Sequence, residues 1–236
     1  MKNTKTIRAC AIAGGISIVT YNEGSAATML GFDGLGPNDT NMEEVYGDNV
    51  ITSDLAAGVT ASSGVQSIVG TPDITLDWAG GAGAGEWDSF TGWDTPARDV
   101  VQTDYKGSFM TLTFTPGSAT VGALITAFDL DEFTGGGATV IDWSILNGAT
   151  TIVSGTESGL SSINGGSVTV NTGMTEAQAI ANAGSNITLR LDLIGGSSSY
   201  QAMDNLTFDQ VAVPEPSSSL LAVAGLGAMA MRRRRQ

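Results

Sequence analysis

The sequence predicts an all-β protein, built as a two-sheet antiparallel β-sandwich of jelly-roll type with one short helix. Segments in which apolar and polar residues alternate recur at short intervals between residues 28 and 212. Turns rich in glycine and asparagine separate these segments, and Gly, Thr, Ser and Val outnumber the good helix formers. About ten short strands in a region of this length suit two packed sheets.

The clearest strand is residues 187–193, where four aliphatic residues alternate with threonine, arginine and aspartate. Residues 109–115 alternate apolar residues with threonine in the same way, so each segment has one face toward a core and one toward water. Further strands are expected at 28–32, 49–52, 74–78, 121–130, 139–146, 151–154, 167–171 and 205–211. Turns are expected at 135–137, 147–148, 164–166 and 195–196.

One helix is predicted after residue 174. Thr175 can cap its N-terminus, Gln178 stands three residues later as the partner of a capping box, and Gly184 can end it. Its apolar stripe is expected to consist of Ala177, Ile180 and Ala181.

Residues 1–27 have the three parts of a secretory signal peptide: a basic start, an apolar centre at 9–20 and a small-residue cleavage zone. The single cysteine, Cys10, lies in the apolar centre, so the exported chain would contain no thiol and no disulfide. Its stability must then come from the core or from bound ions. We therefore expect a signal peptide (1–27), a β-sandwich domain (28–212) and a C-terminal segment (213–236).

The C-terminal segment reads as a short transmembrane anchor with a stop signal. Two prolines break the chain after the domain, residues 220–231 are apolar without one charge, and four arginines follow. By the positive-inside rule the arginines stay in the cytoplasm and the domain is exported. The residues concerned are Pro214, Glu215, Pro216, Arg232, Arg233, Arg234 and Arg235.

In these residues the chain resembles exported bacterial proteins with a PEP-CTERM sorting signal. The Pro-Glu-Pro, the apolar run and the arginine cluster match the three parts of that signal in order. The resemblance covers about a tenth of the chain. It implies processing by an exosortase, delivery to the cell surface or the exterior, and an association with exopolysaccharide and biofilm. It implies nothing about the fold or activity of the preceding domain.

The domain is strongly acidic. Residues 28–213 contain 22 acidic residues but only three basic ones, Arg98, Lys106 and Arg190, which gives a formal charge of −19. Nucleic acid is therefore excluded as a partner, because phosphate binding needs clustered lysine and arginine. Two explanations of the charge remain: a solvated, self-repelling surface that keeps an exported protein soluble, or the binding of calcium by carboxylates.

Three aspartates are the candidate calcium ligands. Residues 202–208 are similar to the last strand of carbohydrate-binding jelly rolls, and this resemblance implies a structural calcium at Asp204. Asp129 and Asp131 lie on one side of an extended segment and would form half a site. The alternative is that these side chains hydrogen-bond nearby loops or face water.

Little catalytic chemistry fits the sequence. It contains no histidine, which excludes Ser-His-Asp and Cys-His catalysis and the usual zinc sites. Two-carboxylate glycoside hydrolysis remains, with Glu86 and a second acid as the candidate pair. Acidic and aromatic residues also alternate irregularly along residues 86–94, where a sugar-binding loop would use Trp87 and Trp93. The residues concerned are Glu86, Asp88, Asp94, Trp87, Phe90 and Trp93. The alternative is that these aromatics are core residues. We expect a structural or binding protein, not an enzyme.

Overall fold

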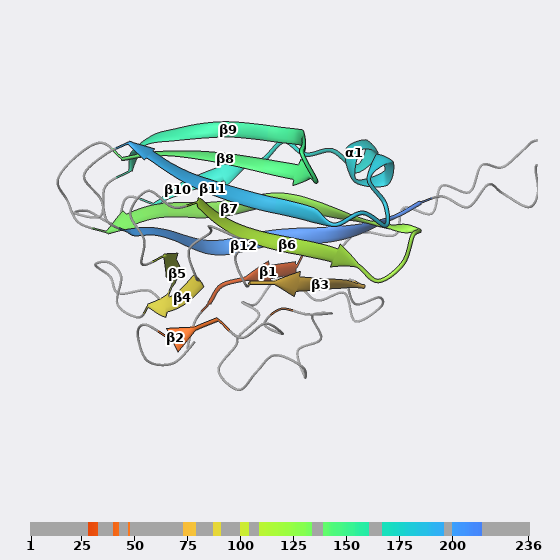
Figure 1. Ribbon diagram of the computed structural model, residues 1–236, viewed down its shortest axis with the longest axis horizontal. Helices are drawn as coiled ribbons and strands as arrows, with labels where there is room; N and C mark the ends of the chain where they lie inside the picture. Colours follow the sequence, from red (N-terminus) through yellow and green to blue (C-terminus); the bar gives the residue numbers. More distant parts are fainter. Residues whose placement is uncertain are drawn as a thin grey trace, which may run out of the picture.

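A computed structural model describes residues 28–32, 40–42, 47, 73–78, 87–90, 100–103, 109–133, 139–160, 167–195 and 200–213. They form two antiparallel sheets and one short helix (Figure 1). Sheet A has the order β10-β7-β12-β5-β4-β2, with β1 also paired to β12. Its strands are β1 (Thr28–Leu30), β2 (Thr40–Asn41), β4 (Trp87–Phe90), β5 (Val100–Thr103), β7 (Val121–Phe133), β10 (Val168–Asn171) and β12 (Tyr200–Ala212).

Sheet B has the order β3-β6-β11-β8-β9. Its strands are β3 (Ile74–Asp77), β6 (Phe109–Pro116), β8 (Thr139–Asn147), β9 (Thr150–Leu160) and β11 (Ile187–Gly195). The chain passes back and forth between the sheets, from β6 in sheet B to β7 in sheet A and from β11 to β12 in the same way. The predicted pair of antiparallel sheets is confirmed, and the jelly-roll connectivity stays a prediction.

Aromatic side chains join the two sheets across the core. Phe114 on β6 meets Phe208 on β12 edge to face, with ring centroids 5.3 Å apart. Phe128 on β7 meets Trp143 on β8 in the same manner at 5.9 Å. Such pairs add to the free energy of burial that large side chains already supply. The inward faces of both sheets therefore form one hydrophobic core.

Two irregularities shape the long β7–β12 pair, which runs through the middle of sheet A. Asn205 on β12 has a φ of 49° and is not matched to a residue of β7 in the strand register, and Thr126 on β7 is not matched to a residue of β12. Each is an extra residue of the kind found in β-bulges, which re-aim side chains locally. Because the two bulges lie on opposite strands, they compensate, and the pairing resumes in register from Phe208 onward.

The helix α1 (Glu176–Ala181) begins as predicted. The Thr175 side chain accepts from the Gln178 backbone, and the Gln178 side chain accepts from the Thr175 backbone N–H at 2.8 Å. The expected apolar stripe is wrong, because Ala177 and Ala181 are exposed and the buried residue is Ala179. A Cβ at Gly122 would lie 2.1 Å from the Ala179 carbonyl oxygen, so the helix packs by close backbone approach.

Most predicted strands are present, but β9 and β12 are longer than expected and β2, β4 and β5 were not predicted. The expected strand at 49–52 lies outside the described residues. So do the signal peptide and the C-terminal anchor. No helix in the described ranges is long and apolar enough to cross a membrane.

Candidate functional site on sheet A

A row of four side chains, three of them polar, crosses four strands of sheet A. Asp88 on β4 pairs with Gln102 on β5, and Gln102 pairs with Ala202 on β12. Ala202 in turn pairs with Asp131 on β7. Directly paired residues share a face, and the neighbours Val101 and Met203 point into the main core. The row therefore lies on the opposite face of the sheet.

A second row runs beside the first. Asp204 on β12 pairs with Asp129 on β7, which pairs with Thr169 on the edge strand β10. Val100 and Ala202 form a small apolar cluster of their own, with Phe90 packed against it. We call the two rows, together with the paired residues Phe90 and Val100, the sheet A patch. Its members are Asp88, Phe90, Val100, Gln102, Asp129, Asp131, Thr169, Ala202 and Asp204.

The centre of the sheet A patch is buried and its margins are accessible. The exposed fractions are 4% for Asp88, 2% for Gln102 and 2% for Asp131. Phe90 and Asp129 are half-buried at the edges of the patch. Buried carboxylates need hydrogen-bond donors, because an unpaired charge in a low-dielectric environment is costly.

The bulge residue Asn205 supplies two such donors. Asn205 Nδ2 donates to Asp129 Oδ2 at 2.8 Å, and the Asn205 backbone N–H donates to Asp204 Oδ1 at 2.7 Å. Thr169 Oγ1 donates to Asp129 Oδ1 at 2.6 Å. The left-handed conformation of Asn205 thus serves two neighbouring carboxylates with one residue.

The calcium site predicted at Asp204, Asp129 and Asp131 is not found in the part of the chain that the structure describes. There, no three or more acidic, histidine or cysteine side chains group in a way that could hold a metal ion. Calcium takes six to eight oxygen ligands. Asp129 and Asp204 accept hydrogen bonds from Thr169 and Asn205, which lie on the strands β10 and β12.

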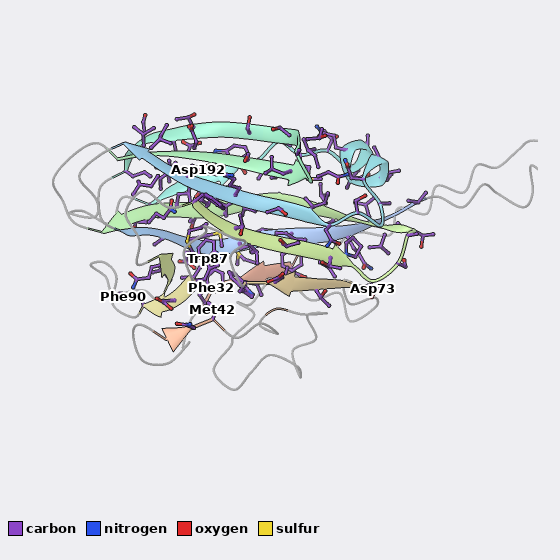
Figure 2. The ribbon with its side chains drawn as sticks, viewed as in Figure 1. Phe32, Met42, Asp73, Trp87, Phe90 and Asp192 are labelled. Carbon is purple, nitrogen blue, oxygen red and sulfur yellow. The ribbon has the colours of Figure 1, made fainter. Side chains whose placement is uncertain are left out.

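Trp87 lies in the core, which contradicts its expected role as a surface platform for sugars. It is 1% exposed, and its Nε1 donates to the Thr111 carbonyl oxygen at 2.8 Å. Its ring meets Trp78 edge to face at 5.7 Å. Figure 2 shows Trp87 beside Phe32 and Met42, with Phe90 away from this group. Alternation along β4 explains the difference, because it sends Trp87 inward and Asp88 outward. Trp93 and Glu86 lie outside the described residues.

The structure unites residues that the sequence left in separate groups. Asp88 and Phe90 came from the predicted sugar-binding loop, whereas Asp131 and Asp204 came from the predicted calcium ligands. Gln102 was missed, because the four-residue strand β5 is too short for its alternation to stand out. The sequence signal that could have found it is the change from apolar Val101 to polar Gln102, which is typical of a strand with one buried face.

Another acid, Asp209, lies further along β12. Burial raises the pKa of its carboxyl, the hydrogen bond from the Gln210 backbone N–H lowers it, and the nearby charge of Glu176 raises it again. Asp209 is 6% exposed. The raised pKa means that folding disfavours the charged form of this side chain.

The accessible margin of the sheet A patch presents the Asp129 carboxylate, the Thr169 hydroxyl and the Phe90 ring. These groups suit the hydroxyls and the hydrocarbon faces of a saccharide.

Sequence comparison decides the identity of the residues that follow β12. The PEP-CTERM protein-sorting motif matches residues 212–236. The chain carries a PEP-CTERM sorting motif. The PEP-CTERM motif is a substrate signal for exosortase processing and marks an exported protein associated with the cell envelope. Its match begins at Ala212, the last residue of β12, so the sorting signal follows directly on the sandwich.

Comparison of whole chains adds no close relative. No curated protein matches the sequence. An arabinose-bound MgGH51 α-L-arabinofuranosidase is similar at 7% identity and a TM-score of 0.41, over 80% of this chain and 27% of that one. The PEP-CTERM chain thus spans about a quarter of the length of that enzyme.

Two other solved structures are similar to this chain. An apo cyclase from Fischerella sp. matches at 12% identity and a TM-score of 0.35, over 80% of this chain and 98% of that one. A family 11 carbohydrate-binding module from Clostridium thermocellum matches at 11% identity and a TM-score of 0.30, over 64% and 96%.

Proposed function

We propose that this chain is an exosortase-processed cell-surface protein whose β-sandwich serves as a structural or binding component of an exopolysaccharide matrix, without catalysis of its own. The match of the PEP-CTERM motif to residues 212–236 carries this proposal. The large excess of acidic residues supports it, since a strongly charged surface keeps an exported protein soluble.

Mass spectrometry of the protein recovered from its native cells tests the sorting step. We expect loss of residues 1–27 and a new C-terminus or an attached group near Pro214 to Pro216. Alanine at these three positions should leave the C-terminus intact. A matched control replaces the adjacent residues 217–219 with alanine and should be processed as the parent is. An intact chain in the cytosol would refute the proposal.

A second function is favoured by one observation, the sheet A patch. We propose that the accessible margin of this patch binds a saccharide through Asp129 and Thr169, with Phe90 as an apolar contact. Trp87 is set aside as a sugar contact because it is buried.

Retention on exopolysaccharide from the native cells tests this binding. Asp129→Asn and Thr169→Ala should each weaken retention by about tenfold, the loss of one or two hydrogen bonds. The control Asp142→Asn makes the same chemical change on sheet B, where Asp142 Oδ1 accepts from Thr156 Oγ1, and should bind normally. If all three variants were retained equally, the patch would be excluded as the saccharide-binding site. Release of reducing sugar from the polysaccharide would instead show a glycosidase.

A further inference from the structure

The longest edge strand among the described residues is β9, at one margin of sheet B. It spans 11 residues, against four each for the edge strands β3 and β10 and two for β2. One side of β9 pairs with β8, and no strand in the described ranges pairs with the other side. Figure 1 shows β9 along the upper margin of the ribbon. An unpaired strand edge presents backbone N–H and C=O groups to any extended partner.

Structure at both ends limits how much of this edge is open. Ile152 has no partner on β8, and its carbonyl accepts from Gln178 Nε2 of α1 at 3.3 Å. Gly159 also has no partner on β8. Both are bulges, which twist an edge away from further pairing. Between them, residues 153–158 pair without interruption with residues 140–145 of β8. The straight, open part of the edge is therefore 153–158.

The side chains of this segment do little to protect it. Residues 153–158 read Val-Ser-Gly-Thr-Glu-Ser, with no lysine, no proline and a single charge at Glu157. Lysine and proline are the residues that usually block edge pairing. Ser154 and Thr156 are exposed, and Gly155 has no side chain to hold a neighbouring strand away.

We propose that residues 154–158, within this open part of β9, pair antiparallel with the same residues of a second copy of this chain. Antiparallel pairing of one segment with itself satisfies two-fold symmetry, in which each copy offers the same surface. Because directly paired residues share a face, the two-fold axis passes beside Thr156, so that Thr156 faces Thr156 and Ser154 faces Ser158 of the other copy. The two glutamates at position 157 then lie on opposite sides of the axis. Two five-stranded sheets would then form one continuous sheet of ten strands.

Charge favours this edge over other surfaces for self-association. The chain has a formal net charge of −14, so most contacts between copies bring acidic residues together. The contact along 154–158 brings mainly serine, threonine and glycine together. A single strand pair buries less than the roughly 1,200 Å² of a standard interface, so the dimer should be weak and concentration-dependent.

Sedimentation velocity of the purified full chain over a wide concentration range tests the proposal. The parent should self-associate, and Ser154→Glu/Thr156→Glu should raise the dissociation constant at least about tenfold, because like charges oppose each other across strands. The control Thr75→Glu/Thr111→Glu adds the same charge on β3 and β6, away from β9, and should associate as the parent does. A parent that stays monomeric, or two variants that behave alike, would overturn the proposal.

Cysteine crosslinking checks the geometry independently. In a Cys10→Ser background, Thr156→Cys places a thiol on the proposed axis, where the Cα atoms of two copies come within the about 7 Å that a disulfide allows. Thr156→Cys should form a covalent dimer on oxidation, and the control Thr75→Cys should not. Crosslinking no greater than in the control would refute pairing through β9. Since all variants share the apolar C-terminal run, association through that run would affect them equally.

Discussion

Replacing Trp87 should weaken the fold, with no direct effect on glycan binding. The indole is almost fully buried, meets Trp78 edge to face and donates to the Thr111 carbonyl at 2.8 Å. Truncation of a buried tryptophan to alanine costs about 3–5 kcal/mol, because it leaves a large cavity. A domain of this size loses about 2–4 °C of melting temperature per kcal/mol. We therefore expect Trp87→Ala to lower the melting temperature by about 6–20 °C.

The hydrogen bond of Trp87 deserves a separate variant. The pairing of β3 with β6 ends at Asp77 and Thr113, so Thr111 lies beyond the end of β3. There, Trp87 of sheet A bonds to the backbone of sheet B through its hydrogen bond to the Thr111 carbonyl. Trp87→Phe keeps an aromatic ring and removes the Nε1 donor. It should cost about 1–3 kcal/mol, less than Trp87→Ala.

Differential scanning calorimetry at neutral pH measures both variants, and circular dichroism confirms that each still folds. The control is Phe90→Ala, which truncates a half-buried aromatic on the opposite face of the same strand. Phe90→Ala should lose less stability than Trp87→Ala and should reduce glycan retention. If Trp87→Ala melted like the parent while its glycan retention disappeared, the burial argument would be refuted.

Three further predictions concern the core and the helix. Gly155→Ala should destabilise the protein by about 1–3 kcal/mol, because the new Cβ would lie 2.5 Å from Cζ2 of Trp143. Trp143→Phe should relieve part of that loss in the double variant, so additive losses in thermal melts would contradict the steric argument. Gln201→Met should raise the free energy of unfolding by about 1–3 kcal/mol in urea titrations, since the Gln201 amide is fully buried without a hydrogen bond to any described residue. A lower free energy of unfolding would instead indicate that the amide has a hydrogen-bond partner. Asp209→Asn should stabilise the protein at pH 7, because burial raises the pKa of Asp209 above 3.8 and the cost of charging the side chain appears as the pH rises through that raised pKa. In melts from pH 3 to 7, the melting temperatures of the variant and the parent should converge at the acidic end. A difference that stays constant with pH would refute the titration argument.

Local patterns predicted the regular parts of the fold well. Residues 187–193 alternate cleanly, and β11 has three of its aliphatic side chains fully buried there: Ile187, Leu189 and Leu191. The capping box of Thr175 and Gln178 formed as predicted, because its hydrogen bonds need only residues three apart. The glycine after Asn147 also turns the β8–β9 hairpin, with a φ of 56° at Gly148.

The short strands and the bulges escaped sequence analysis. The strands β4 and β5 have four residues each, too few for a period-two pattern to be distinguished from chance. The bulge at Asn205 interrupts the alternation of β12, so the predicted strand began at Asn205 although β12 begins at Tyr200. Both features depend on which strand lies alongside, and that neighbour is distant in the sequence.

The sequence by itself determined the class of fold, the acidic character of the domain and the sorting address at residues 212–236, because each is written in contiguous residues. Tertiary structure alone decided the roles of individual side chains. It turned Trp87 inward, brought Asp88 into one row with Asp131, and left β9 at an open edge. The physical reason is that strand pairing and register join residues far apart in the chain, and a change of one residue in register exchanges the core face for the outer one.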